Sequence, residues 1–212
     1  MGKGNGFFGN DEGRNGMRAD SKVIAVFDYD GTLAARDSFW PFLVAVAGWP
    51  RALLALGSTL VAAVINKPEK AERRSFIKER MIRLLLKGRR VDEFGPAIEK
   101  VKRWSRDLPT ADLLREHYAK GHHVVIASGS LDIYLPHLLG KLPHHALICT
   151  EVESVQGVIT GNTPRGNCVR ARKAKLVAEY VEAHGPFDDS WGYGNLPHDL
   201  QMMELVKHRV IV

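Results

Sequence analysis

The sequence predicts an α/β protein whose mostly parallel sheet is interrupted by an all-helical insertion. Short β-branched runs alternate with helical patterns after residue 108, which favours a parallel sheet covered by helices on both faces. Residues 38–107 have a helical pattern throughout. The composition, 45% hydrophobic and 25% charged over 212 residues, is typical of a globular chain and excludes wholesale disorder.

Each element follows from its local pattern. The run at 22–27 (KVIAVF) is β-branched and ends in acids and glycine, so it predicts a buried strand. Residues 151–162 (EVESVQGVITGN) have the pattern of a hairpin. The full set of expected elements is strands at 22–27, 122–128, 145–150, 190–193 and 209–212, and helices at 110–120, 130–140, 170–184 and, briefly, from Pro197.

The chain divides into three parts. Residues 1–21 carry six glycines before position 17 and few apolar side chains, so they predict a disordered tail. The core is expected from residues 22–37 and 108–212, with 38–107 as the helical insertion. Ligands bind such sheets beyond the carboxyl ends of the strands, which is where we look for chemistry.

The charge of the chain indicates which kind of partner it binds, and its cysteine content indicates the cellular compartment. The chain has 30 Lys+Arg against 24 Asp+Glu, and residues 67–90 alone hold ten Lys or Arg and three Glu. This balance favours an anionic partner, but no nucleic-acid-binding motif accompanies the basic run, so nucleic acid is not expected. Two cysteines and no signal-peptide pattern favour a reducing, cytoplasmic location.

Two carboxylates directly follow the first expected strand, in the run Asp28-Tyr29-Asp30-Gly31-Thr32-Leu33. When the chain bends at the glycine, both acids can face one site. One can then bind a hard cation and attack, while the other handles protons. The alternative, a solvated Asp turn or helix cap, is common where Asp and Gly occur without such a strand.

Three later positions place polar groups at expected strand or helix ends. Ser128 and Gly129 follow an apolar strand and can donate to phosphoryl oxygens, although Ser128 also suits a helix cap. A basic segment at 170–175 begins a helix. Asn195 and Asp199 follow the strand at 190–193 and offer oxygen ligands.

The run FDYDGTL at 27–33 resembles the nucleophile motif of the haloacid dehalogenase superfamily of phosphohydrolases. The later positions resemble its other motifs, and the spacing from Cys168 selects Lys173 over Lys175 as the essential lysine. That spacing and the insertion, which corresponds to a helical cap, resemble the phosphoserine-phosphatase-like branch. The resemblance implies a Rossmann-like core and phosphatase activity.

The resemblance also implies roles. Asp28 attacks a phosphomonoester and forms an aspartyl-phosphate, and Asp30 is the general acid and base. The resemblance implies that Mg²⁺ is bound by Asp28, Asp30 and Asn195 or Asp199. It implies that the oxygens of the phosphoryl group are bound by Ser128, Lys173 and the amides of Tyr29 and Gly129. Asn195 replaces the usual acid, so a catalytically weakened, phosphate-binding regulatory protein is an alternative.

Two features of the predicted cap, Asp37 and the apolar run at 52–65, indicate which kind of substrate to expect. Asp37 stands where phosphoserine phosphatases read the substrate amine, but it also suits the cap of the first helix. The apolar run at 52–65 is either a core helix of the cap or a helix that docks on an anionic membrane beside the basic segment. This combination is similar to phosphatidylglycerophosphatase C-like proteins and favours a lipid headgroup phosphate; a soluble phosphorylated small molecule is the alternative.

Overall fold

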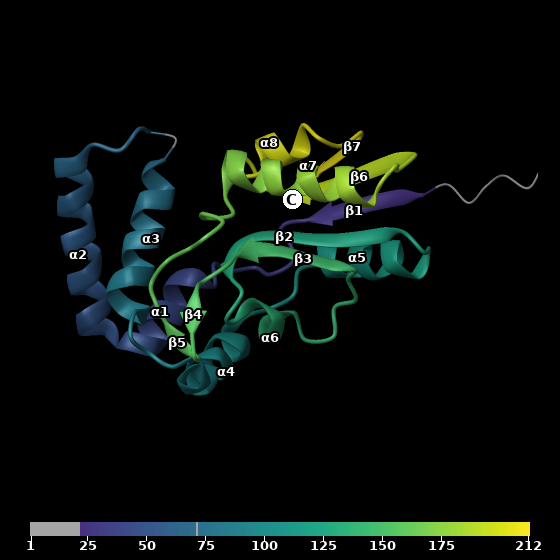
Figure 1. Cartoon of the computed structure of the whole chain (residues 1–212). Coiled ribbons are helices and arrows are strands. Elements are labelled where there is room, and N and C mark those ends of the chain that lie inside the picture. The colour runs from purple at the N-terminus through teal and green to yellow at the C-terminus, as the bar shows by residue number, and fades with distance from the viewer. Residues whose placement is uncertain (1–21, 71) are drawn as a thin grey trace, which may run out of the picture.

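The computed structural model describes residues 22–70 and 72–212; the tail expected at 1–21 lies outside the described residues. Five parallel strands form the central sheet in the order β3-β2-β1-β6-β7. Their bounds are β1 Val23–Phe27, β2 His123–Leu131, β3 Ala146–Thr150, β6 Asp189–Gly194 and β7 His208–Ile211. The α/β fold class expected from the sequence is therefore confirmed, with helices covering the sheet (Figure 1).

Alternating side chains of β1 fill two apolar layers. Ile24 and Val26 belong to the layer beneath α7 (Arg170–His184) and α8 (Leu200–Met203). Ala25 and Phe27 belong to the layer shared with α5 (Thr110–Ala119), α6 (Leu135–Leu139) and the cap. Because successive residues of a strand point to opposite faces, this continuous apolar run is what a strand buried on both faces requires.

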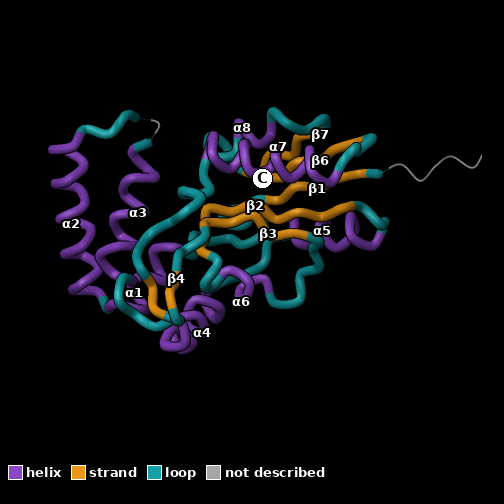
Figure 2. The backbone as a smooth tube through the Cα atoms, in the orientation of Figure 1, coloured by secondary structure: helices purple, strands orange, loops and turns teal. Residues whose placement is uncertain are grey.

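The insertion forms a group of helices beyond one end of the sheet (Figures 1 and 2). Its elements are α1 Phe39–Ala47, α2 Trp49–Asn66, α3 Arg73–Leu86, the 3₁₀ helix η1 Val91–Phe94 and α4 Gly95–Trp104. The chain enters and leaves it along two linkers that pair with each other. Ala35 N donates to Arg106 O at 2.9 Å, and Leu108 N donates to Leu33 O at 2.8 Å.

A small second sheet joins the cap to the core. Strands β4 (Ser154–Val155) and β5 (Val158–Ile159) form the expected hairpin. Its backbone bonds with the segment after α3: Gly88 N donates to Ile159 O at 2.8 Å, and Ile159 N donates to Arg89 O at 2.9 Å. The hairpin therefore ties the loop between β3 and α7 to the cap.

Three element boundaries differ from the sequence expectation by more than one residue. β2 continues to Leu131, which pairs with Thr150 after an irregularity, so α6 begins at Leu135 and not at 130. The last short helix begins at Leu200 and not at Pro197. Residues between Asn195 and Asp199 form a turn in which Asp199 N donates to Asn195 O at 3.0 Å, and this turn delays the helix.

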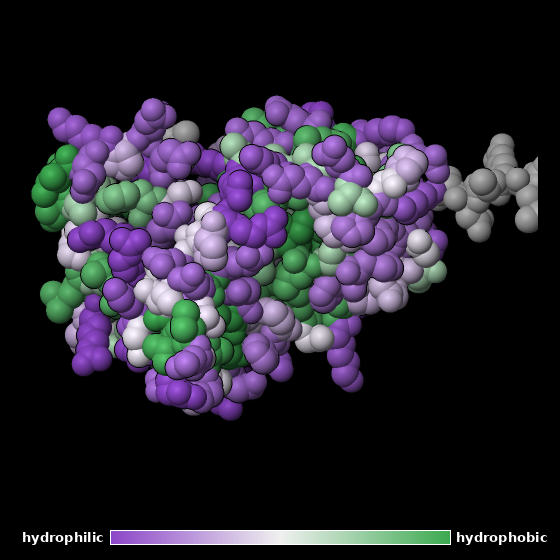
Figure 3. All heavy atoms as spheres, viewed as in Figure 1, coloured by the Kyte–Doolittle hydropathy of each residue, from purple (hydrophilic) through white to green (hydrophobic). Residues whose placement is uncertain are grey.

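Helix α2 presents its small side chains inward and its large ones outward. Its buried residues are Ala52, Ala55, Thr59, Ala62 and Ala63, and its exposed large apolar residues are Trp49, Leu53, Leu54, Leu60, Val61, Val64 and Ile65. Hydrophobic atoms lie along this outer edge of the molecule in Figure 3. By length and composition α2 is able to cross a membrane, and 28% of it is buried in the protein.

Candidate active site

The chain reverses direction directly after β1, and this turn brings both predicted carboxylates to one site. The carbonyl of Tyr29 accepts hydrogen bonds from the amides of Thr32, Leu33 and Ala34 at 3.2, 2.9 and 2.9 Å. Gly31 has φ +83°, and a Cβ there would collide with the Asn195 side chain. The backbone conformation therefore favours glycine at 31, and a side chain there would also displace the Asn195 amide.

Lys173 bridges two buried carboxylates. Its Nζ donates to Asp28 Oδ1 and to Asp199 Oδ1, each at 2.6 Å, and all three residues are at most 5% exposed. Burial raises the pKa of Asp28 to about 6, against the opposing effect of Lys173. Burial disfavours the charged form of Lys173, but the two carboxylates outweigh it and raise the lysine's pKa. The charged lysine thus stabilises the carboxylate form of Asp28.

Asp30 is held in place by groups from the cap entrance and from β2. Ser38 N donates to its Oδ1 at 2.9 Å, and the Ser130 hydroxyl donates to its Oδ2. The Ser38 hydroxyl in turn lies 2.7 Å from the Ser130 hydroxyl and 3.1 Å from that of Tyr134. Burial, followed by the charge of Asp37, raises the pKa of Asp30, which favours its protonated form.

The donor set at this site fits a hard divalent cation. Among the described residues no cluster of three or more His, Cys, Asp or Glu side chains is arranged to hold a metal. Candidate oxygens instead come from the Asp28 carboxylate, the Asp30 carbonyl and the Asn195 amide. Asn195 Nδ2 lies 3.3 Å from Asp30 O, and a half-turn of the amide would place its oxygen there. Oxygen donors of mixed charge are those that Mg²⁺ accepts.

Asp199 has both carboxylate oxygens occupied. Lys173 donates to Oδ1, and Asn195 N donates to Oδ2 at 3.0 Å. A Cβ on Gly194 would lie 2.8 Å from Asp199 Cβ, so only glycine at 194 admits this side chain. Asp199 therefore positions Lys173 and the Asn195 loop, and its direct contact with a metal stays a prediction.

Most of the predicted residues share one small pocket. It has a volume of about 50 Å³ and is lined by Asp28, Asp30, Asp37, Arg74, Lys78, Gly129, Val169, Arg170, Lys173, Asn195, His198 and Asp199. Ser128 is fully buried beside it, where its Oγ accepts a 3.0 Å hydrogen bond from Ser130 N. The Tyr29 ring is also buried, with its hydroxyl 3.4 Å from Ser105 Oγ.

Asp37 lies one residue before Ser38, the N-cap of α1, and its side chain bonds to the first turn of that helix. Its Oδ1 accepts a 3.2 Å hydrogen bond from Trp40 N in the first turn of α1, although the side chain also borders the pocket. One carboxylate oxygen is thus engaged by the backbone. The capping interpretation of Asp37 now has a contact to support it, and amine recognition stays a prediction.

Cationic groups that were not singled out in the sequence also enter the pocket: Arg74 and Lys78 from α3, and Arg170 from the start of α7. A signal for Lys78 exists, because it lies on the buried stripe of α3 with Met81, Ile82 and Leu85. A charge on the apolar face of an amphipathic helix needs a partner or a function. Residues 67–90 contain ten Lys or Arg, so a count of charges alone does not single out Lys78.

A parallel sheet with paired aspartates at the end of its first strand, a buried lysine opposite them and an inserted helical cap defines a hydrolase of the haloacid dehalogenase type. The chain belongs to this family: the model of the haloacid dehalogenase-like hydrolases matches residues 25–204. The family resemblance seen in the sequence is thereby confirmed.

The chain is also similar to individual proteins and solved structures. The chain is 29% identical over 206 residues to protein CicA of Caulobacter vibrioides, covering 92% of this chain and 87% of CicA. A protein of unknown function from Bordetella pertussis Tohama I has the same fold, with a TM-score of 0.72, 19% identity and 90% of both chains covered.

The phospho-aspartyl intermediate analogue of phosphoserine phosphatase gives a TM-score of 0.62 at 16% identity, over 90% of this chain and 86% of that one. The fold is therefore that of the phosphoserine-phosphatase-like branch, as expected. The similarity to phosphatidylglycerophosphatase C-like proteins stays a prediction.

Proposed function

We propose that the protein is a Mg²⁺-dependent phosphomonoester hydrolase that works through an aspartyl-phosphate on Asp28. The observation that carries the proposal is the buried Asp28–Lys173–Asp199 cluster beside an enclosed Asp30. Lys173 favours the ionised form of Asp28 against the effect of burial, and the ionised form is the state a carboxylate nucleophile needs. Asp30 lies two residues further on the same turn and has the raised pKa of a general acid.

The reaction has two steps. Asp28 attacks the phosphorus atom, the bond to the leaving oxygen breaks, and Asp30 gives its proton to that oxygen. Asp30 then takes a proton from the water that attacks the aspartyl-phosphate, which releases inorganic phosphate and restores Asp28. The Lys173 ammonium, the Ser128 hydroxyl and the amides of Tyr29 and Gly129 would hold the phosphoryl oxygens. A bound Mg²⁺, held by Asp28, Asp30 and Asn195, would supply charge neutralisation.

The decisive test is whether phosphate becomes attached to Asp28. Wild-type protein with Mg²⁺ and a phosphomonoester, quenched in acid, should gain the mass of one phosphoryl group on the peptide containing Asp28. Asp28→Asn should lose both this adduct and the turnover of an aryl phosphate. The matched control is Asp92→Asn, an exposed acid paired with Arg90, which should retain both. Full turnover by Asp28→Asn would refute the mechanism.

For the substrate, we propose a phosphate on a lipid headgroup, such as phosphatidylglycerophosphate, reached by peripheral contact with an anionic membrane. The outward apolar face of α2 supports membrane contact, since burying it against lipid removes large side chains from water. A groove of about 790 Å³ lies between α2 and α3. It is lined by the cationic side chains of Arg51, Lys87 and Arg89 and by the apolar side chains of Leu54 and Leu84. Cations beside an exposed apolar face complement anionic headgroups.

The competing substrate class is a soluble metabolite of the phosphoserine type. The capping role of Asp37 weighs against it, because the helix already engages one oxygen of the carboxylate that would read an amine. Steady-state kinetics on phosphoserine and on phosphatidylglycerophosphate in mixed micelles separates the two classes. Preference for phosphoserine, together with no sedimentation of the protein with anionic liposomes at low salt, would remove the lipid proposal and leave the phosphatase chemistry intact.

A further inference from the structure

An apolar cavity lies on the outside of the cap, and we call it the outer cavity. Its lining residues come from α1, from α4 and from the first residue of α2. Its volume is about 480 Å³, which is within the range of a site for an organic ligand. Val44 and Val101 are buried side chains of its lining, and the charged residues among the described lining are Lys100 and Arg103. The chemistry of this cavity therefore suits an apolar ligand.

Tryptophan side chains surround the outer cavity. Three of the four tryptophans of the chain line it, namely Trp40, Trp49 and Trp104. The rings of Trp40 and Trp49 pack edge to face with their centroids 6.3 Å apart. Trp49 is 59% exposed and Trp104 is 50% exposed. Large apolar rings that gather around one cavity and stay half exposed are typical of a surface that a ligand covers.

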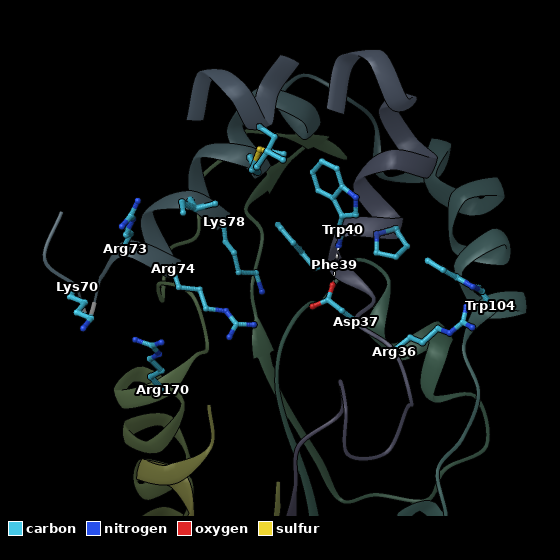
Figure 4. Close-up of a pocket in the computed structure, with 14 residues that line it drawn as sticks. Arg36, Asp37, Phe39, Trp40, Lys70, Arg73, Arg74, Lys78, Trp104 and Arg170 are labelled. Atoms are coloured by element: carbon cyan, nitrogen blue, oxygen red, sulfur yellow. Dashed lines mark hydrogen bonds between the residues drawn. The ribbon is translucent and has the colours of Figure 1, made fainter. Parts of the chain in front are cut away.

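The outer cavity adjoins a larger cavity inside the cap, which we call the inner cavity (Figure 4). The inner cavity has a volume of about 770 Å³. Trp40, Pro41 and Trp104 line both cavities, so one ligand can extend from one into the other. Further apolar side chains continue the wall of the inner cavity: Phe39, Leu56, Ile77 and Met81.

The inner cavity in turn adjoins the catalytic pocket. Asp37, Arg74, Lys78 and Arg170 line both of them. Figure 4 shows Arg74 and Arg170 on the opposite side of the inner cavity from Trp104. The lining thus changes from charged beside the catalytic pocket to apolar at the outside of the cap. A phosphate with a hydrocarbon chain attached to it has the same order of polarity.

We propose that the outer cavity binds the hydrocarbon chain of a phosphomonoester substrate whose phosphate lies at Asp28. This inference rests on the proposed function and deepens it, because it requires that the substrate carry a long alkyl or acyl chain. The chain would leave the bilayer, cover Trp49 and Trp104, and pass Trp40 into the inner cavity. Each methylene group removed from water in this way favours binding.

The position of the outer cavity supports a lipid chain as its occupant. Trp49 is the first residue of α2, so the opening lies at one end of the helix whose outward apolar face we place on the membrane. Lys100 and Arg103 border the same cavity, and cations beside an apolar opening complement anionic headgroups. A chain can therefore enter the cap from the bilayer without crossing a charged surface.

The experiment measures turnover of straight-chain alkyl phosphates, from ethyl to hexadecyl phosphate, each below its micelle concentration and without membranes. Wild-type kcat/KM should rise about two- to fourfold for each methylene group that enters the cavities, and should then level off. Because no membrane is present, adsorption of the protein to lipid cannot cause this rise. Turnover that is independent of chain length would overturn the inference.

Two substitutions change residues that line the outer cavity and not the inner one. Ala45→Phe should fill the outer cavity, so the rise should level off at a shorter chain. Trp49→Ala removes part of its wall, so the longest chains should gain less. The matched control is Ala178→Phe, which enlarges an exposed alanine of α7 and should keep the wild-type profile. Melting temperatures identify the folded variants, and a wild-type profile in a folded cavity variant would contradict the proposal.

Alkyl phosphonates separate failure of this inference from failure of the proposed function, because their carbon–phosphorus bond is not an ester bond. Their binding to the wild-type protein is measured by tryptophan fluorescence. If the protein hydrolyses no alkyl phosphate but binds dodecyl phosphonate about tenfold more tightly than ethyl phosphonate, the reaction is wrong and the chain site stands. If phosphate becomes attached to Asp28 but neither turnover nor binding depends on chain length, the reaction stands and the chain site is wrong. A dimer that Trp49→Ala converts into a monomer in sedimentation would assign the cavity to a second copy of the chain and overturn the proposal.

Discussion

Lys173 donates a 2.6 Å hydrogen bond to Asp28 across 145 residues of sequence, and both side chains are almost fully buried. The ion pair stabilises the ionised nucleophile that the proposed reaction needs. The same contact makes the site a determinant of stability, because the second carboxylate on Lys173, that of Asp199, is buried as well.

Replacing Lys173 by Met should therefore destabilise the metal-free protein. Asp28 and Asp199 would face each other without their shared cation, which costs about 3–5 kcal/mol for a buried pair. Chemical denaturation in the presence of a chelator measures the loss, and lowering the pH should recover part of it as Asp28 protonates. Lys175→Met is the control, since Lys175 is exposed and lies 4.0 Å from Glu179. Equal stability of the two variants would contradict the structural role of Lys173.

Asn195→Asp tests whether the missing acid weakens the enzyme. In the metal-free protein the new carboxylate would face the Asp30 carbonyl, to which Asn195 now donates, so the melting temperature in chelator should fall. Mg²⁺ should bind more tightly, because one negative charge is added to its ligands. Activity and melting temperature are measured as Mg²⁺ is added. The variant should reach half-saturation at a lower Mg²⁺ concentration than the wild-type protein, and its turnover number should be comparable. A large rise from near-zero turnover would instead favour a regulatory protein.

The outward face of α2 should govern membrane binding. Combined Leu54→Ser, Val61→Ser and Ile65→Ser should strongly reduce co-sedimentation with vesicles that contain anionic phospholipid, since all three are at least 60% exposed and removing them leaves the cap core intact. Turnover of a short-chain, water-soluble substrate should be unaffected. The control changes three exposed apolar residues that lie outside the cap, Leu113, Val155 and Leu205, to Ser. Equal losses in both triple variants would show that α2 has no special role.

The core elements could be predicted because their signals are local. The run at 22–27 is apolar on both faces and is followed at once by Asp-x-Asp-Gly, and α7 has the predicted bounds 170–184. The inward face of α2 could not be predicted in this way. Its run is apolar all round, and side-chain size decides which face packs: the alanines allow close approach to α3. The sequence analysis did not single out Lys78, because it differs from the neighbouring cations in its position on the buried face of α3 and not in its charge.

The paired linkers at 33–35 and 106–108 place the two ends of the cap next to each other on the core. Such an insertion adds to the core sheet without changing its strand order, so evolution can lengthen, replace or recharge it while β1 and its aspartates stay in register. Chimaeras in which residues 38–105 are exchanged between relatives of this fold follow directly from this arrangement. The sheet with its aspartates and the cap can then change as separate units, joined at these paired linkers and at the β4–β5 hairpin.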